Sequence, residues 1–157
     1  MTAVPHPYTQ RFKLRAAVYL LLRRDDQVLL ALRQNTGFGD GQYGVVGGHL
    51  DGGENARLAL VREAYEEAGI RIDPADLIPR LVMHRAASGP YDEAIDFFFD
   101  LYIWTGEITN AEPTKCAGFS FFRPADLPKN TIPYIGHAID GVERGETYLE
   151  YGWPVKV

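Results

Sequence analysis

The N-terminal third of the chain alternates between short apolar stretches and polar turns, a pattern typical of β-strands. Residues 15–22 form a mainly apolar stretch, residues 23–26 are polar, and residues 28–32 are apolar again. Two such stretches around a polar turn predict a hairpin of two largely buried strands. Residues 35–53 contain eight glycines around the apolar piece 43–46, so we expect irregular backbone with one short strand embedded in it.

Helix-forming residues dominate segment 54–68, and apolar residues recur at helical spacing in segment 133–145. Gly69 follows the first segment, where a helix end favours a left-handed backbone, and Pro133 suits the first turn of the second. We therefore predict two helices over these ranges. Strands are predicted between the helices at 80–86, 95–104 and 119–122, and the tail 148–157 is unassigned.

The predicted strands and helices do not alternate regularly along the chain. Their order predicts an α/β fold in which helices pack against a mixed sheet, not a doubly wound parallel sheet. The chain has 157 residues, of which 46% are hydrophobic, and this is enough for one sizeable core. No repeat, low-complexity stretch or linker divides it, so we predict a single domain over residues 1–157.

A helical wheel of segment 54–68 predicts where its side chains point. Glu63, Glu66 and Glu67 fall on one face of the helix. An apolar stripe falls on the opposite face, and we expect this stripe to dock on the sheet and to leave the three carboxylates directed away from the core. The stripe comprises Leu58, Val61, Tyr65 and Ala68.

Three carboxylates on neighbouring turns of a helix repel one another, so a compensating cation is expected nearby. Clustered carboxylate oxygens are typical ligands of Mg²⁺ or Mn²⁺, which keep positions for water and substrate phosphate. Arg62 lies four residues before Glu66 and can hold its carboxylate, and Glu54 is favoured at the helix start by the helix dipole. Paired glutamates on a helix are more often a solvated face, so their clustering alone does not decide the question.

The spacing of these residues resembles the Nudix box. The pattern in segment 48–70 is Gly, five residues, Glu, seven residues, Arg-Glu, a hydrophobic residue, any residue, Glu-Glu, any residue, Gly and a hydrophobic residue. The seven matching identities are Gly48, Glu54, Arg62, Glu63, Glu66, Glu67 and Gly69. Such a match occurs by chance on the order of once in 10⁸ windows. Ala64 is smaller than the aliphatic residue usual in the box, and Val46 stands where the family often has proline.

This resemblance implies an α/β/α sandwich around a mixed β-sheet and hydrolysis of a nucleoside diphosphate linked to another group. The implied metal ligands are Gly47, through its carbonyl, and Glu63, Glu66 and Glu67. The implied catalytic residues are Glu54, Arg62, Glu66 and Glu112. Among them, Arg62 would orient the carboxylates, Glu54 would assist them, and a carboxylate would accept the proton of the attacking water.

Glu112 lies outside the box, in a loop after Trp104, at a spacing similar to that of family members whose loop carboxylate completes the metal site or acts as the base. A plain solvated glutamate is the alternative, and Asp92 and Glu93 are weaker candidates for the same task. Tyr43, Phe38 and Trp104 are candidates for stacking on a base or ribose, although aromatic residues beside strands are more often core. His49 and Cys116 are interpreted as structural residues.

Charge and cysteine content restrict the partners and the compartment. The formal net charge of −5 opposes a broad electrostatic grip on nucleic acid, so an anionic substrate would be gripped through cations. The longest apolar stretch, 16–22, is far short of the roughly 20 residues of a membrane-spanning helix, and no leader segment is expected. A single cysteine cannot form an internal disulfide, which favours the cytoplasm. Exposed strand edges are compatible with a homodimer.

These observations predict a Mg²⁺- or Mn²⁺-dependent diphosphatase acting on a small nucleoside diphosphate derivative. The leading substrate class is nucleoside triphosphates, unmodified or oxidised, cleaved to nucleoside monophosphate and pyrophosphate. The alternatives are nucleoside diphosphate-sugars, ADP-ribose and dinucleoside polyphosphates, which would use the same helix with different loops. A diphosphate isomerase and a non-catalytic nucleotide-binding domain are less favoured, the latter because all four box glutamates are present.

Overall fold

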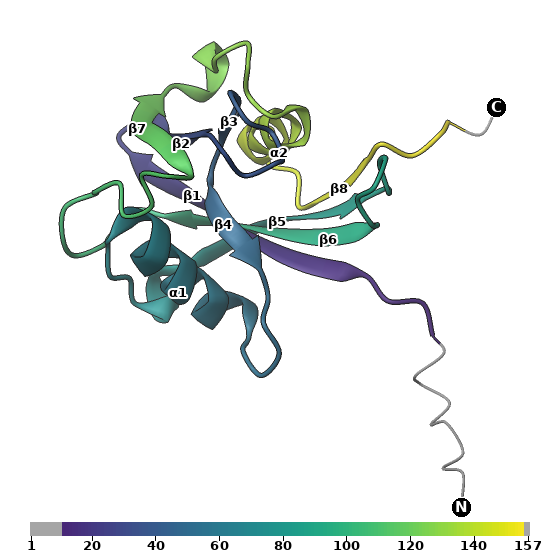
Figure 1. Ribbon diagram of the computed structural model, residues 1–157, viewed down its shortest axis with the longest axis horizontal. Helices are drawn as coiled ribbons and strands as arrows, with labels where there is room; N and C mark the ends of the chain where they lie inside the picture. The colour runs from purple at the N-terminus through teal and green to yellow at the C-terminus, as the bar shows by residue number, and fades with distance from the viewer. Residues whose placement is uncertain (1–10, 156–157) are drawn as a thin grey trace, which may run out of the picture.

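The computed structural model describes residues 11–155. These residues form an eight-stranded sheet with helix α1 on one face and helix α2 on the other (Figure 1). The strands are β1 (Arg15–Arg24), β2 (Gln27–Arg33), β3 (Tyr43–Gly44), β4 (Val46–His49), β5 (Ile78–Arg85), β6 (Ala94–Leu101), β7 (Cys116–Phe122) and β8 (Tyr148–Tyr151). The α-helices are α1 (Ala56–Ala68) and α2 (Pro133–Glu143), and the short 3₁₀ helices are η2 (Pro74–Asp76) and η3 (Pro124–Asp126).

Strand β1 lies at the centre of the sheet and explains its mixed character. It pairs in parallel with β6, antiparallel with β4 along its first half, and antiparallel with β2 at its end. The strand order is β3-β2-β1-β6-β5-β8, with β7 on β2 and β4 on β1. Val18 and Leu20 face the core under α1, whereas Leu21 faces the core under α2. Burial of both faces accounts for the continuous apolar sequence of this strand.

The predicted secondary structure agrees with the structure in kind, with differences at the boundaries. The hairpin, both helices and the mixed sheet are confirmed, while the predicted strand 43–46 is divided into β3 and β4. β6 ends at Leu101 rather than at residue 104. The unassigned tail contains β8, which pairs in parallel with β5. Such a short edge strand is stabilised by backbone pairing with its neighbour, so its own sequence pattern does not predict it. Residues 1–10 and 156–157 of the predicted domain lie outside the described residues.

The apolar stripe predicted for α1 matches the side that packs on the sheet only in part, because Ala68 is buried and Val61 packs against the core while the other two members are exposed. Leu58 and Tyr65, two members of the stripe, have exposed fractions of 48% and 55%. The fully buried residues of α1 are Ala59, Leu60, Ala64 and Ala68. Small alanine side chains let the helix approach β4 and β1 closely, and a wheel that ranks side chains by hydrophobicity gives these positions too little weight.

Two of the three helix carboxylates are consequently turned inward. Glu63 is only 12% exposed and Glu67 is half-buried, whereas Glu66 is 50% exposed. As expected, all three line a cavity beside the glycines of β4 and lie outside the apolar core, but Glu63 and Glu67 are enclosed between α1 and β4 and do not point into bulk solvent. Over residues 11–155, no helix combines the length and the apolar character that crossing a membrane requires.

Candidate functional site

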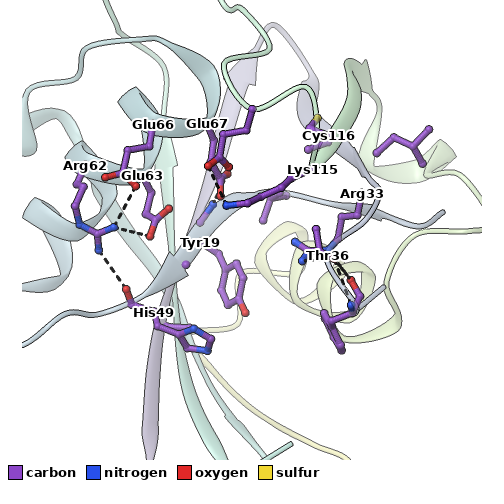
Figure 2. Close-up of a pocket in the computed structure, with 18 of the residues that line it drawn as sticks. Tyr19, Arg33, Thr36, His49, Arg62, Glu63, Glu66, Glu67, Lys115 and Cys116 are labelled. Carbon is purple, nitrogen blue, oxygen red and sulfur yellow. Dashed lines mark hydrogen bonds and ion pairs between the residues drawn. The ribbon is translucent and has the colours of Figure 1, made fainter. Parts of the chain in front are cut away.

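A cavity of about 660 Å³ lies beside α1, where it meets the edge of the sheet at β4. Side chains from both helices, from strands β1, β2, β4, β5 and β7, and from the loops at 35–38 and 112–115 line it. In Figure 2, Glu63, Glu66 and Glu67 lie together on one side of this cavity, and Arg33 and Thr36 face them from the other side. The cavity therefore combines an acidic wall with basic and aromatic surfaces.

Local sequence signals fix the two ends of α1. The side chain of Asn55 accepts a hydrogen bond from the Leu58 amide, and this caps the first turn. Gly69 ends the helix in the left-handed conformation, with φ of 67°, and donates its N–H to the Tyr65 carbonyl. The predicted end at Gly69 is confirmed, and the helix begins two residues after the predicted start at Glu54.

Two adjacent glycines of β4 allow the helix carboxylates to lie against the sheet edge. The Gly47 amide donates a hydrogen bond to Glu67 Oε2 at 3.2 Å. A Cβ atom at Gly47 would overlap the carbonyl oxygen of Val18, and one at Gly48 would lie 2.7 Å from Glu63 Cδ. A side chain at Gly47 would therefore force β4 away from β1, and one at Gly48 would push α1 away from β4.

The surroundings of the inward carboxylates oppose their ionisation. Burial raises the pKa of Glu67 to about 8, and the negative charges of Glu63 and Glu112 add to the shift. Burial also raises the pKa of Glu63, although Arg62 opposes the shift. Ionising Glu63 and Glu67 in these surroundings costs free energy, and a bound cation would offset that cost.

Arg62 connects three of the box carboxylates. Its guanidinium contacts Glu54 at 2.6 Å, Glu63 at 2.8 Å and Glu66 at 3.5 Å, and it donates to the His49 carbonyl. The hydrogen bond from Arg62 lowers the pKa of Glu54, whose Oε1 also accepts the Asp51 amide. Glu54 is therefore an ionised group that fixes Arg62 and the preceding turn.

The loop after Trp104 brings Glu112 to the end of α1. The Ala111 amide donates to the Glu67 carbonyl at 3.1 Å, and this ties the loop to the last turn of the helix. Glu112 lines the cavity and pairs with Lys115 at 3.1 Å. The weaker candidates lie elsewhere: Asp92 is exposed, and Glu93 contacts His84 Nε2 at 2.6 Å.

The three aromatic candidates occupy different places. Phe38 lines the cavity. Tyr43 packs edge to face on Phe122, with 5.3 Å between ring centroids, and Trp104 borders a separate shallow depression beside η2. Of these three aromatic residues, only Phe38 lines the cavity that contains the carboxylates. The sequence could not show this, because all three residues lie beside predicted strands.

The family of the chain follows from comparison with known proteins. A family model described as the NUDIX domain matches residues 12–140. The chain belongs to the NUDIX family. The resemblance that segment 48–70 indicated is thereby confirmed, and three of its glutamates, Glu63, Glu66 and Glu67, line the cavity.

Relatives of this NUDIX chain carry different names. A putative 8-oxo-dGTP diphosphatase of Bacillus subtilis (strain 168) is 30% identical over 138 residues, which cover 88% of this chain and 82% of that protein. The NAD-capped RNA hydrolase NudC of Escherichia coli (strain SMS-3-5 / SECEC) is 28% identical over 111 residues, or 71% of this chain. The aligned part spans only 40% of that NudC.

Solved structures show the same fold. A MutT NUDIX hydrolase from Burkholderia pseudomallei superposes with a TM-score of 0.75 at 22% identity, covering 82% of this chain and 98% of that one. A NUDIX hydrolase from Nitrosomonas europaea gives a TM-score of 0.73 at 19% identity, covering 87% and 93%. The predicted fold class, an α/β sandwich around a mixed sheet, is confirmed.

The donor set of the NUDIX box fits a hard divalent cation. Glu63, Glu66, Glu67 and Glu112 offer carboxylate oxygens, the ligand type that Mg²⁺ and Mn²⁺ prefer. Within residues 11–155, no three carboxylate, imidazole or thiolate side chains already converge as a cation cluster. Arg62 occupies one side of Glu63, and Glu67 is the carboxylate whose raised pKa a bound cation would lower.

Several cavity residues were not singled out from the sequence. They are Arg15, Tyr19, Arg33, Arg85, Lys115 and Tyr134. Positions 15, 17 and 19 alternate along β1 and could have indicated one shared face. Cys116 and His49 also line the cavity, but burial raises the pKa of the Cys116 thiol, which contacts the Gly118 carbonyl at 3.4 Å. This is the opposite of an activated nucleophile.

Proposed function

We propose that this NUDIX chain hydrolyses a diphosphate bond in a nucleoside diphosphate derivative with the help of Mg²⁺ or Mn²⁺. The observation that carries the proposal is that Glu63, Glu67 and Glu112 all line a single cavity. The first two come from the NUDIX box and the third from a loop more than forty residues later. The cavity volume of about 660 Å³ lies within the roughly 300–1,000 Å³ range of small-molecule sites.

Each residue has a proposed task in this reaction. A bound divalent cation supplies positive charge for the phosphate oxygens and lowers the pKa of water. Glu63, Glu66, Glu67 and the Gly47 carbonyl are the proposed ligands. Glu54 and Arg62 hold the carboxylates in position through the contacts described above. Glu112 is the proposed proton acceptor, because it lies in the cavity on a loop and is more exposed than Glu63.

Nucleoside triphosphates, unmodified or oxidised, are the proposed substrate class, with nucleoside monophosphate and pyrophosphate as products. Support comes from the Bacillus subtilis relative, named a putative 8-oxo-dGTP diphosphatase, which aligns over 82% of its length. Support also comes from Phe38, which offers an aromatic ring inside the cavity. The cytoplasmic location and the homodimer predicted from the sequence remain proposals.

A substrate panel tests this function. The purified chain is assayed with Mg²⁺ or Mn²⁺ against nucleoside triphosphates, nucleotide sugars, ADP-ribose and dinucleoside polyphosphates, and the phosphorus-containing products are identified. We expect cation-dependent release of pyrophosphate and nucleoside monophosphate from a triphosphate. Release from another member of the panel would replace the substrate class and keep the reaction type. Failure to cleave any member would contradict the proposal.

A further inference from the structure

A basic recess of Arg15, His49 and Arg85 lies in the same cavity as the NUDIX carboxylates. Arg15 and Arg85 flank one residue: Ala94 of β6 is the register partner of Arg15 on β1 and of Arg85 on β5. Side chains in register across a sheet share a face, so the two guanidinium groups flank the small side chain of Ala94. Adjacent strands are about 4.8 Å apart, so β1 and β5, which lie on either side of β6, are roughly twice that distance apart, and both arginines line the same cavity.

The guanidinium of Arg85 is fixed in place. Its Nε donates to Asp96 Oδ2 at 2.7 Å and its Nη2 to Asp96 Oδ1 at 3.3 Å, and its Cζ lies 4.1 Å from the centre of the Tyr134 ring. Asp96 is fully buried. Nη1 of Arg85 has no hydrogen-bond partner among the described residues. A rigid donor therefore remains available.

Arg15 lacks strong partners. Its Nη1 is 3.4 Å from His49 Nε2 and its Nη2 is 3.4 Å from the Asp92 carbonyl oxygen, both at the long limit for hydrogen bonds. Its Nε is buried without any partner, and no carboxylate within residues 11–155 forms an ion pair with it. A buried donor without a partner calls for an explanation, and a ligand supplies one.

The charge of the recess points to an anion. Arg85 is paired with Asp96, whereas Arg15 forms no ion pair with a carboxylate of residues 11–155, although the formal net charge of the chain is −5. Burial and the positive charge of Arg15 lower the pKa of His49, and its ring is a hydrogen-bonding group beside Arg15.

We propose that Arg15 and Arg85 form a second phosphate-binding subsite, which holds a phosphoryl group of the substrate other than those gripped at the box carboxylates. Guanidinium groups bind phosphate oxygens through paired, charge-assisted hydrogen bonds. Anion binding follows from the recess alone, and only the identity of the substrate rests on the proposed function. The phosphoryl group is either the terminal phosphate of a triphosphate or a phosphate ester on the ribose.

Binding of inorganic phosphate in EDTA tests the subsite without hydrolysis. With no divalent cation present, the box carboxylates repel phosphate, so saturable binding reports the basic side chains of the cavity, and the Arg15 variant shows whether the recess is the binding place. We expect Arg15→Gln to raise the dissociation constant at least about tenfold, the weight of one charge-assisted hydrogen bond. Arg123→Gln, a matched change at an exposed arginine that does not line the cavity, should leave it unchanged. Arg85 is left intact because removing it would strand the buried Asp96.

Kinetic comparison of substrate pairs then identifies the phosphoryl group. The pairs are a nucleoside triphosphate with its diphosphate, and a dinucleotide with and without a 2′-phosphate. A larger loss of kcat/KM for the triphosphate in Arg15→Gln assigns the terminal phosphate, and a larger loss for the 2′-phosphorylated dinucleotide assigns the ester. An equal loss for all four compounds overturns the subsite, as does phosphate binding that is absent or unchanged in Arg15→Gln. A chain that binds phosphate at Arg15 but cleaves nothing refutes only the proposed function.

Discussion

The carboxylate of Glu63 lies directly over Gly48, close enough that a Cβ atom there would be 2.7 Å from Glu63 Cδ. The contact joins the first glycine of the NUDIX box to its first metal-ligand candidate. It gives a physical reason for glycine at this position: the helix that carries the carboxylates rests on the bare backbone of β4. A side chain at residue 48 would compete with Glu63 for the same space.

Gly48→Ala should lower both stability and activity. The added methyl group must displace Glu63 or separate α1 from β4, and such overpacking costs about 1–3 kcal/mol. Urea unfolding and steady-state kinetics measure the two effects. Gly52→Ala is the matched control, because a Cβ there meets nothing within 4 Å. Equal behaviour of the two variants would show that the contact has no consequence.

Glu67→Gln should lower kcat by at least about two orders of magnitude, because it removes the buried charge proposed to bind the cation. Gln has almost the same shape, so the fold should persist and circular dichroism should be unchanged. Glu107→Gln makes the same change on an exposed residue that does not line the cavity and should retain full activity. Turnover like that of the original chain in Glu67→Gln would remove Glu67 from the mechanism.

The metal-free protein should lose stability as pH rises. Burial raises the pKa of folded Glu67 to about 8 from its ordinary 4.5, so the folded state holds this proton more tightly than the unfolded state. The resulting contribution to stability is fully present below pH about 4.5 and is lost as pH rises through about 8. Urea unfolding in EDTA across this range should show the decline, and Glu67→Gln should reduce it.

Adding Mg²⁺ should oppose this decline, because a ligand that binds only the folded state stabilises it by mass action. The increase in unfolding free energy should be larger near pH 8 than near pH 5, since protons compete for the same carboxylates. A Mg²⁺ effect of equal size at both pH values, or one retained in full by Glu67→Gln, would contradict a cation at Glu67.

Glu112→Gln separates the two tasks proposed for the loop carboxylate. If Glu112 is a proton acceptor, its replacement should lower kcat about 10²–10⁴-fold and leave the half-saturating Mg²⁺ concentration unchanged. As a metal ligand, its replacement should raise that concentration instead. A Mg²⁺ titration of initial rates measures both quantities. If neither changes, Glu112 is a solvated loop residue that does no more than pair with Lys115.

Much of the fold was readable because its signals are local. The polar turn between β1 and β2, the Gly69 end of α1 and the helical spacing of α2 depend on neighbouring residues. The orientation of α1 was not readable, because its buried residues are three alanines and Leu60, and because Glu63 and Glu67 lie against the glycines of β4. Strand β8 was missed because it exists only as a partner of β5.

The sequence by itself determined the family and the acidic helix, because the NUDIX box is a fixed spacing of residues within a segment of 23 and can be recognised without a three-dimensional structure. Only the tertiary structure decided that Glu63 and Glu67 face inward, that Glu112 joins them, and that the basic recess opens into the same cavity. Arg15 and Arg85 are seventy residues apart in the sequence and lie on either side of Ala94 in the sheet. This relationship depends on which strands pair and in which register, and the local sequence pattern does not indicate it.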